Sequence, residues 1–252
     1  MGLSAQMQQG PQEQCSNPHP QGGRGQCTQF GSTGTSTFKS TVDDINLGQS
    51  QVKSAGNVYL DAKRDINVVG GNGQGLQSTA GALDVKALRN LNNSGSIEAT
   101  TGSTMVVANL TNTGTVTLSK NATANDSITT SSNLSNSVDG QIFSSGHLTV
   151  NTTGTLQNAG LVQSAKGANV TAGVFNQDLA TAKFLMDTSA DVTSVGDSQM
   201  TVAGLMSNTG LVQGGVPDPS GRQVVLSTGR LRRIRAIDRD ELPEEFRSAG
   251  SG

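Results

Sequence analysis

Pairs of acidic side chains are the residues of this sequence most suited to chemistry. Hydrolysis of a sugar linkage needs two carboxyl groups, one on each side of the bond that is cleaved. Three pairs lie close together in the chain: Asp43 with Asp44, Asp61 with Asp65, and Asp187 with Asp191. Lys63 and Arg64 lie between Asp61 and Asp65, and these positive charges would keep both carboxylates ionised. We therefore expect surface ion pairs and assign no catalytic residue.

Histidine and cysteine are scarce in this chain. His147 precedes Leu148 in an alternating stretch, so its side chain is expected to point outward as a lone histidine without a catalytic partner. Cys15, Cys27 and His19 are fewer than the four ligands of a zinc site. Two interpretations of the cysteines remain: they form a small disulfide loop, or they are thiols without a chemical role. The sequence holds no phosphate-binding loop or nucleophile motif. We predict no cofactor, no metal and no enzymatic activity.

The composition excludes several classes of protein. Only 33% of the residues are hydrophobic, 3% are aromatic and 14% are charged. Gly, Ser, Thr, Asn and Gln replace them, a mixture that disfavours helices and favours short strands between turns. A net charge of −2 removes the electrostatic case for nucleic acid. The sequence has no apolar run long enough to cross a membrane, and its first residues do not read as a secretory signal.

An internal repeat is the strongest signal in the sequence. Its unit is Leu or Met, then Asn, Gly, and Ile or Val, at alternate positions. The copies are Leu91, Asn93, Gly95 and Ile97; Leu110, Asn112, Gly114 and Val116; Leu134, Asn136, Gly140 and Ile142, with two extra residues; Leu156, Asn158, Gly160 and Val162; and Met206, Asn208, Gly210 and Val212. The Asn positions follow at intervals of 19, 24, 22 and 50 residues. The last interval indicates one degenerate turn, which we place near Phe175 and Asn176.

Such a unit cannot bury its own apolar face, but stacked units can, with each strand pairing in parallel with the equivalent strand of the next coil. Leu, Ile and Val then form columns inside a rod. We expect Asn to occupy a left-handed corner and to hydrogen-bond the Asn of the next coil, and Gly to supply a second corner with positive φ. The sequence therefore predicts an all-β fold, a right-handed parallel β-helix, over residues 45–213.

The two ends of the chain differ from the repeats in texture. Residues 1–44 are rich in Gln, Gly, Pro and Ser, and we expect a low-complexity, loosely ordered tail. Residues 214–252 begin with a Gly- and Pro-rich linker and continue with an Arg-rich patch at 230–235 that acidic residues follow. We expect this charged C-terminal segment to be solvated and to cap the end of the rod.

The segment 56–68, GNVYLDAKRDINV, and the repeat copies after it resemble the haemagglutinin repeats of the filamentous haemagglutinin family of bacterial exoproteins. The likeness covers residues 45–213. It implies a β-helical shaft that two-partner secretion exports, through a dedicated outer-membrane transporter, to the cell surface or the medium. The motifs of the family's secretion domain and toxin junction do not occur, so we expect an interior fragment or a truncated copy.

The resemblance implies the structural shaft of a secreted adhesin that attaches to a receptor or glycan on host or bacterial surfaces. One alternative is a spacer in a contact-dependent growth-inhibition effector, in which the shaft sets the reach of a toxin. Another is a polysaccharide-degrading β-helix enzyme, which the acidic pairs would serve. We expect neither nucleic-acid binding nor membrane insertion.

Overall fold

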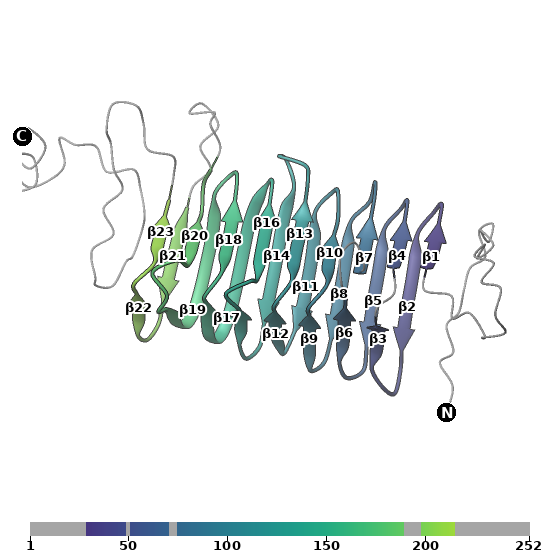
Figure 1. Cartoon of the computed structure of the whole chain (residues 1–252), viewed down its shortest axis with the longest axis horizontal. Coiled ribbons are helices and arrows are strands. Elements are labelled where there is room, and N and C mark those ends of the chain that lie inside the picture. Colours follow the sequence, from purple (N-terminus) through teal and green to yellow (C-terminus); the bar gives the residue numbers. More distant parts are fainter. Residues whose placement is uncertain (1–28, 49–50, 71–74, 189–197, 215–252) are drawn as a thin grey trace, which may run out of the picture.

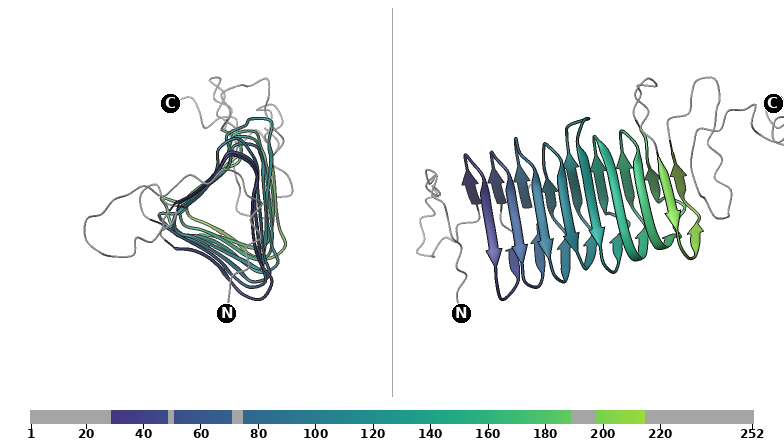
Figure 2. Two further views of the ribbon diagram at one scale, coloured as in Figure 1. Left: turned by 90° about the vertical axis from the view of Figure 1, so that its right-hand side faces the viewer. Right: turned by 180° about the vertical axis from the view of Figure 1, so that it is seen from behind.

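The protein is described by a computed structural model that covers residues 29–48, 51–70, 75–188 and 198–214. These residues form a parallel β-solenoid, a rod of stacked coils, which confirms the predicted parallel β-helix (Figure 1). Seen along its axis, the rod has a triangular cross-section (Figure 2). Each coil contributes strands to three sides, which we call faces A, B and C in the order in which the chain visits them.

Face A is a sheet of nine strands. Its strands are β1 (Gln29–Ser32), β4 (Gln51–Ser54), β7 (Gly75–Ser78), β10 (Ser96–Glu98), β13 (Thr115–Ser119), β16 (Gln141–Ser144), β18 (Leu161–Ser164), β20 (Lys183–Leu185) and β23 (Leu211–Gln213). Each strand between β1 and β23 pairs in parallel with the strand one coil earlier and the strand one coil later, as in the register of Val52 with Leu76.

Faces B and C share two long strands that continue around the corner between them. Face B contains β2 (Ser36–Ser40), β5 (Val58–Ala62), β8 (Leu83–Ala87), β11 (Ser103–Val107), β14 (Asn125–Thr130), the first parts of β17 (His147–Asn158) and β19 (Ala168–Gln177), and β21 (Gln199–Val202). Face C contains β3 (Ile45–Gly48), β6 (Ile66–Val69), β9 (Asn90–Asn93), β12 (Asn109–Asn112), β15 (Leu134–Asn136), the last parts of β17 and β19, and β22 (Met206–Asn208).

The core consists of aliphatic columns that follow from alternation along each strand. Leu91, Leu110, Leu134 and Leu156 lie in consecutive register on face C and are at most 2% exposed. Burial of one such side chain stabilises the fold by about 1.5–3 kcal/mol. Because a single coil supplies only a few of them, stability comes from the stacking of many coils.

The solenoid begins earlier than the predicted boundary at residue 45. Strands β1 and β2 lie within the segment 1–44 that we expected to be a loosely ordered tail. The two rings of Phe30 and Phe38 pack edge to face at a centroid distance of 5.3 Å, and both contact the core. The surrounding Gly, Ser and Thr hid this coil, since two aromatic positions are too few for a periodic pattern. Residues 1–28, with both cysteines, and 215–252, with the Arg-rich patch, lie outside the described residues.

The expected reason for the repeat glycines was wrong. Among the described glycines, a positive φ occurs at Gly75, Gly102 and Gly167, and at none of the repeat positions. A Cβ on Gly114 would instead overlap the carbonyl oxygen of Gly95, one coil below. Gly114, Gly140, Gly160 and Gly210 are therefore required by the close approach of neighbouring atoms, not by a left-handed backbone.

The expected corner position of the repeat asparagines was also wrong. Asn93, Asn112, Asn136 and Asn158 are each the last residue of a β-strand, and their side chains are at most 2% exposed. They point into the rod, because alternation places the residue two positions after an inward Leu on the same inner side.

Candidate binding surface

The central acidic pair predicted from the sequence is divided between two ion pairs at the surface. Asp61 lies on face B and pairs with Lys39 of the preceding coil at 2.8 Å. Asp65 follows the next corner and pairs with Arg89 of the following coil at 3.3 Å. The expectation of surface ion pairs is confirmed here, but the partners come from neighbouring coils and are not the two basic residues that lie between the carboxylates in the sequence. Because Lys39, Asp61 and Arg89 are about half exposed, while Asp65 is 13% exposed, the pair on face B in particular adds little to stability.

The other two acidic pairs have different surroundings. Asp43 and Asp44 both contact Arg64 of the next coil, at 2.6 and 3.4 Å. Asp187 is 1% exposed, and Asp191 lies outside the described residues. The structure thus brings the first pair together around one guanidinium, which is an arrangement for linking coils.

The remaining candidate chemical groups give no cluster. His147 begins β17, is half-buried, and lies in register with Asn125. Within residues 29–48, 51–70, 75–188 and 198–214, no group of His, Cys, Asp and Glu side chains could hold a metal ion. The same residues contain no helix long and apolar enough to cross a membrane.

The repeat asparagines form a hydrogen-bonded file inside the rod. The file consists of Asn93, Asn112, Asn136, Asn158, Gln177 and Asn208. The side-chain amide nitrogen of each member donates to the side-chain oxygen of the next, at 2.7–2.9 Å. The predicted contact between asparagines of successive coils is thereby confirmed. The degenerate turn lies where we expected it, but its ladder residue is Gln177, one position beyond Asn176.

The first five amides of this file also donate to backbone carbonyl oxygens at the corner between faces C and A. The amide nitrogen of Asn136, for example, donates to the carbonyl oxygens of Gly140 at 3.0 Å and Leu161 at 3.2 Å. A buried polar group is costly unless it is hydrogen-bonded, and a fully connected file fixes the register of the coils. The file is therefore structural, and its members from Asn93 to Gln177 are too deeply buried to reach a ligand.

A second internal column, of serines, was missed by sequence reasoning. Ser54, Ser78, Ser144 and Ser164 end strands of face A and are at most 4% exposed. The hydroxyl of Ser78, for example, donates to the carbonyl oxygen of Gly56 at 2.8 Å. The signal was an apolar residue, any residue, then Ser, at 52–54, 76–78, 142–144 and 162–164.

One buried carboxylate, on β14 of face B, is hydrogen-bonded to serines of face A. Asp126 is 1% exposed. Its oxygens accept hydrogen bonds from the backbone nitrogen of Ser103 at 2.7 Å and from the hydroxyls of Ser119 at 2.5 Å and Ser144 at 2.6 Å. Three donors around one enclosed carboxylate hold the coils together, and its burial leaves no path for a substrate.

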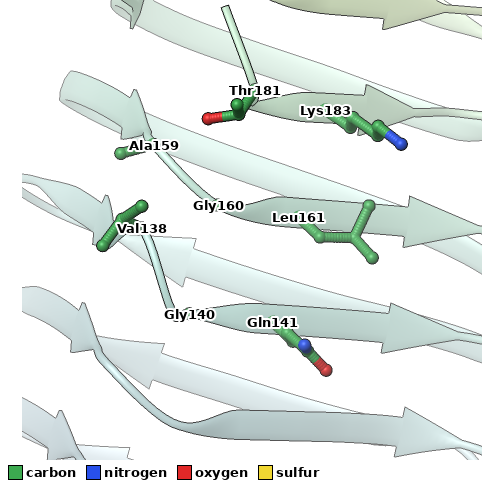
Figure 3. A pocket seen from close by; sticks show the side chains of 8 residues that line it. All are labelled: Val138, Gly140, Gln141, Ala159, Gly160, Leu161, Thr181 and Lys183. Carbon is green, nitrogen blue, oxygen red and sulfur yellow. The ribbon is translucent and has the colours of Figure 1, made fainter. Parts of the chain in front are cut away.

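A shallow hollow of about 330 Å³ lies at the corner that leads into face A. The repeat glycines Gly140 and Gly160 form its floor because they lack side chains (Figure 3). Gln141, Leu161 and Lys183 project side by side from β16, β18 and β20 along its edge. Lys183 is the one ionisable side chain in the lining, so the hollow contains no acid–base pair.

Face B presents a two-part outer surface. On β2, β5 and β8, its outward positions carry Lys39, Tyr59, Asp61, Asp84 and Lys86. Tyr59 is 38% exposed. From β11 onward the outward positions of this face carry no Lys, Arg, Asp or Glu within the described residues.

The later part of face B carries two parallel columns of outward side chains, which we call the neutral array. The first column is Thr104, Ser127, Thr149, Asn169 and Gln199, and the second is Val106, Thr129, Asn151, Thr171 and Thr201. Nine of these ten residues carry a hydroxyl or a carboxamide, and none carries a charge.

Comparison with protein-family models, with curated proteins and with solved structures finds no match to this chain. The β-solenoid and its surfaces are therefore the basis for any statement about function.

Proposed function

We propose that this chain is a segment of the shaft of a secreted bacterial adhesin, as its resemblance to haemagglutinin repeats implies. The observation that supports the proposal most is the outside of the rod, where polar uncharged side chains recur from coil to coil in register. A surface of this kind offers many equivalent weak contacts instead of one deep pocket.

Part of this outer surface is stiffened by its own hydrogen bonds. On face C, the amide of Asn67 donates to Asn46 at 2.7 Å, and that of Asn92 donates to Asn67 at 2.8 Å. Together with the internal amide file, this outer ladder fixes neighbouring coils to one another. A rigid rod holds repeated contacts at fixed spacing, so that each further contact forms at high effective concentration.

An adhesion assay tests this proposal. Beads coated with the full chain are expected to attach to bacterial or host cells in greater numbers than beads coated with an unrelated β-solenoid of similar length. Attachment no greater than that of the control rod would contradict the adhesin proposal. That outcome agrees instead with a passive spacer, which needs length but no affinity.

A further inference from the structure

We propose that the neutral array on face B binds an uncharged, linear polysaccharide whose chain lies along the axis of the rod. This inference names the ligand class and the face for the adhesin of the preceding section, and it rests on that function. It is carried by the geometry, the charge and the unused hydrogen-bonding capacity of the array.

The array is regular in two directions. Its strands β11, β14, β17, β19 and β21 lie side by side in register, at a spacing of about 4.8 Å. The two columns are separated by two residues along each strand, roughly 6.6 Å. These strands belong to one side of the rod and are labelled in Figure 1. An array of this size spans roughly 20 Å along the rod, which suits a chain of repeating units better than a single small molecule.

The side chains of the array are turned to solvent and are little used within the protein. Thr149, Asn151, Asn169 and Thr171 at its centre are all exposed. Within the array, one hydrogen bond joins two side chains, from Ser127 to Thr104 at 3.4 Å. The outer ladder of face C is different, because its amides are bonded to one another. The array therefore keeps donors and acceptors for a ligand.

The chemistry of these groups selects an uncharged, hydroxyl-rich partner. Hydroxyls and carboxamides both donate and accept hydrogen bonds, as sugar hydroxyls do. An anionic or cationic chain would lose hydration here without meeting an opposite charge. The same face on β2, β5 and β8 carries Lys39, Asp61, Asp84 and Lys86, so the ligand is expected to avoid that part.

None of the ten positions of the array carries an aromatic side chain. Affinity for a sugar must therefore come from hydrogen bonds and not from stacking on a ring. Each sugar makes a few hydrogen bonds that replace bonds to water, so a single sugar binds weakly. One unit of an extended sugar chain advances by about the spacing of adjacent strands, so successive units meet successive coils. Affinity is therefore expected to rise about three- to tenfold per added sugar, up to roughly five sugars.

The test uses the full chain and unbranched β-1,4-linked glucose oligomers of one to eight units, with oligogalacturonate as the anionic comparison. Calorimetry is expected to show affinity that rises with length and then levels off, and little binding of the anionic chain. The double variant Thr149→Lys with Thr171→Lys is expected to weaken binding of the long oligomer at least tenfold. The matched control, Thr111→Lys with Gln157→Lys on face C, makes the same charge change at exposed strand positions and is expected to bind normally.

Three results would overturn the inference: affinity that does not depend on length, tighter binding of the anionic chain, or equal loss in both double variants. Circular dichroism of each variant confirms that it is folded before binding is measured. Failure of the polysaccharide inference can be distinguished from failure of the adhesin proposal. Beads that attach to cells while glucose oligomers do not bind would remove the neutral array as the contact and keep the adhesin.

Discussion

Removal of one member from the internal amide file has a cost that depends on the direction of its hydrogen bonds. In Asn136→Ala, the side-chain oxygen of Asn158 loses its donor, which lies at 2.9 Å, and stays buried at 0% exposure. An unpaired buried acceptor costs about 1–3 kcal/mol, and the space left by the amide adds about 1 kcal/mol. The amide of Asn112 keeps the carbonyl oxygens of Gly114 and Gln141. We expect a total loss of about 2–4 kcal/mol.

The last member of the file provides the matched control. Asn208 accepts from Gln177 at 2.9 Å and, within the described residues, donates to no further side-chain amide. After Asn208→Ala, the Gln177 amide still donates to the carbonyl oxygen of Leu211 at 3.0 Å. No buried acceptor loses its donor, so the expected loss is about 1 kcal/mol or less.

Urea titration followed by far-ultraviolet circular dichroism measures both variants against the parent chain. The order of the two midpoints is the decisive result, with Asn136→Ala well below Asn208→Ala. Equal midpoints, or the reverse order, would refute the reasoning that an orphaned oxygen sets the cost. A changed slope would indicate that coils at one end unfold separately, which the linear architecture permits.

Three further predictions concern the corners and the buried or paired carboxylates. Gly114→Ala places a Cβ against the Gly95 carbonyl oxygen and is expected to cost about 1–3 kcal/mol in thermal unfolding. Gly31→Ala, with open space at its Cβ, should stay within about 0.5 kcal/mol of the parent. Burial raises the pKa of Glu98, but hydrogen bonds from Lys120 and Gln77 and the Lys120 charge outweigh it, so the pKa lies below its usual 4.5. Its stabilisation is complete above pH 4.5 and is lost as pH falls through the lower, folded pKa; urea midpoints from pH 6 to pH 3 should therefore fall less in Glu98→Gln than in the parent chain. Asp126→Asn exchanges an acceptor for a donor among Ser103, Ser119 and Ser144 and should cost about 1–3 kcal/mol in urea; an unchanged midpoint would show that this carboxylate does not hold the coils.

The interior of the solenoid could be predicted because stacking forces equivalent positions to solve the same packing problem. Leu91, Leu110, Leu134 and Leu156 repeat because each must fill the column between its two neighbours. The same constraint explains why the asparagines repeat, since each buried amide needs a hydrogen-bonding amide in the coil above or below it. Residues that recur in the sequence at the period of one coil are therefore in contact in the folded protein.

Other interior features were not predicted, because they meet the same packing requirement with other residue types or through the backbone. Gln177 brings the same carboxamide to the file as Asn does, so a search for Asn passes over it. The serine column uses a residue that is common throughout this chain, and its pattern does not stand out from composition. The repeat glycines were found, but their cause lies in the backbone of the next coil, as the overlap of a Gly114 Cβ with Gly95 shows.

The outward positions are not subject to that packing constraint, which is why they bear most directly on function. Lys86 and Val106 are register neighbours on face B, and Thr129 follows Val106 one coil later. The residues beside them, Val85 and Met105, point inward and are fully buried. Packing thus continues unchanged while the outer surface changes from charged to neutral. The fold does not require that change, and this is why we propose the neutral part of face B as the surface that contacts a ligand.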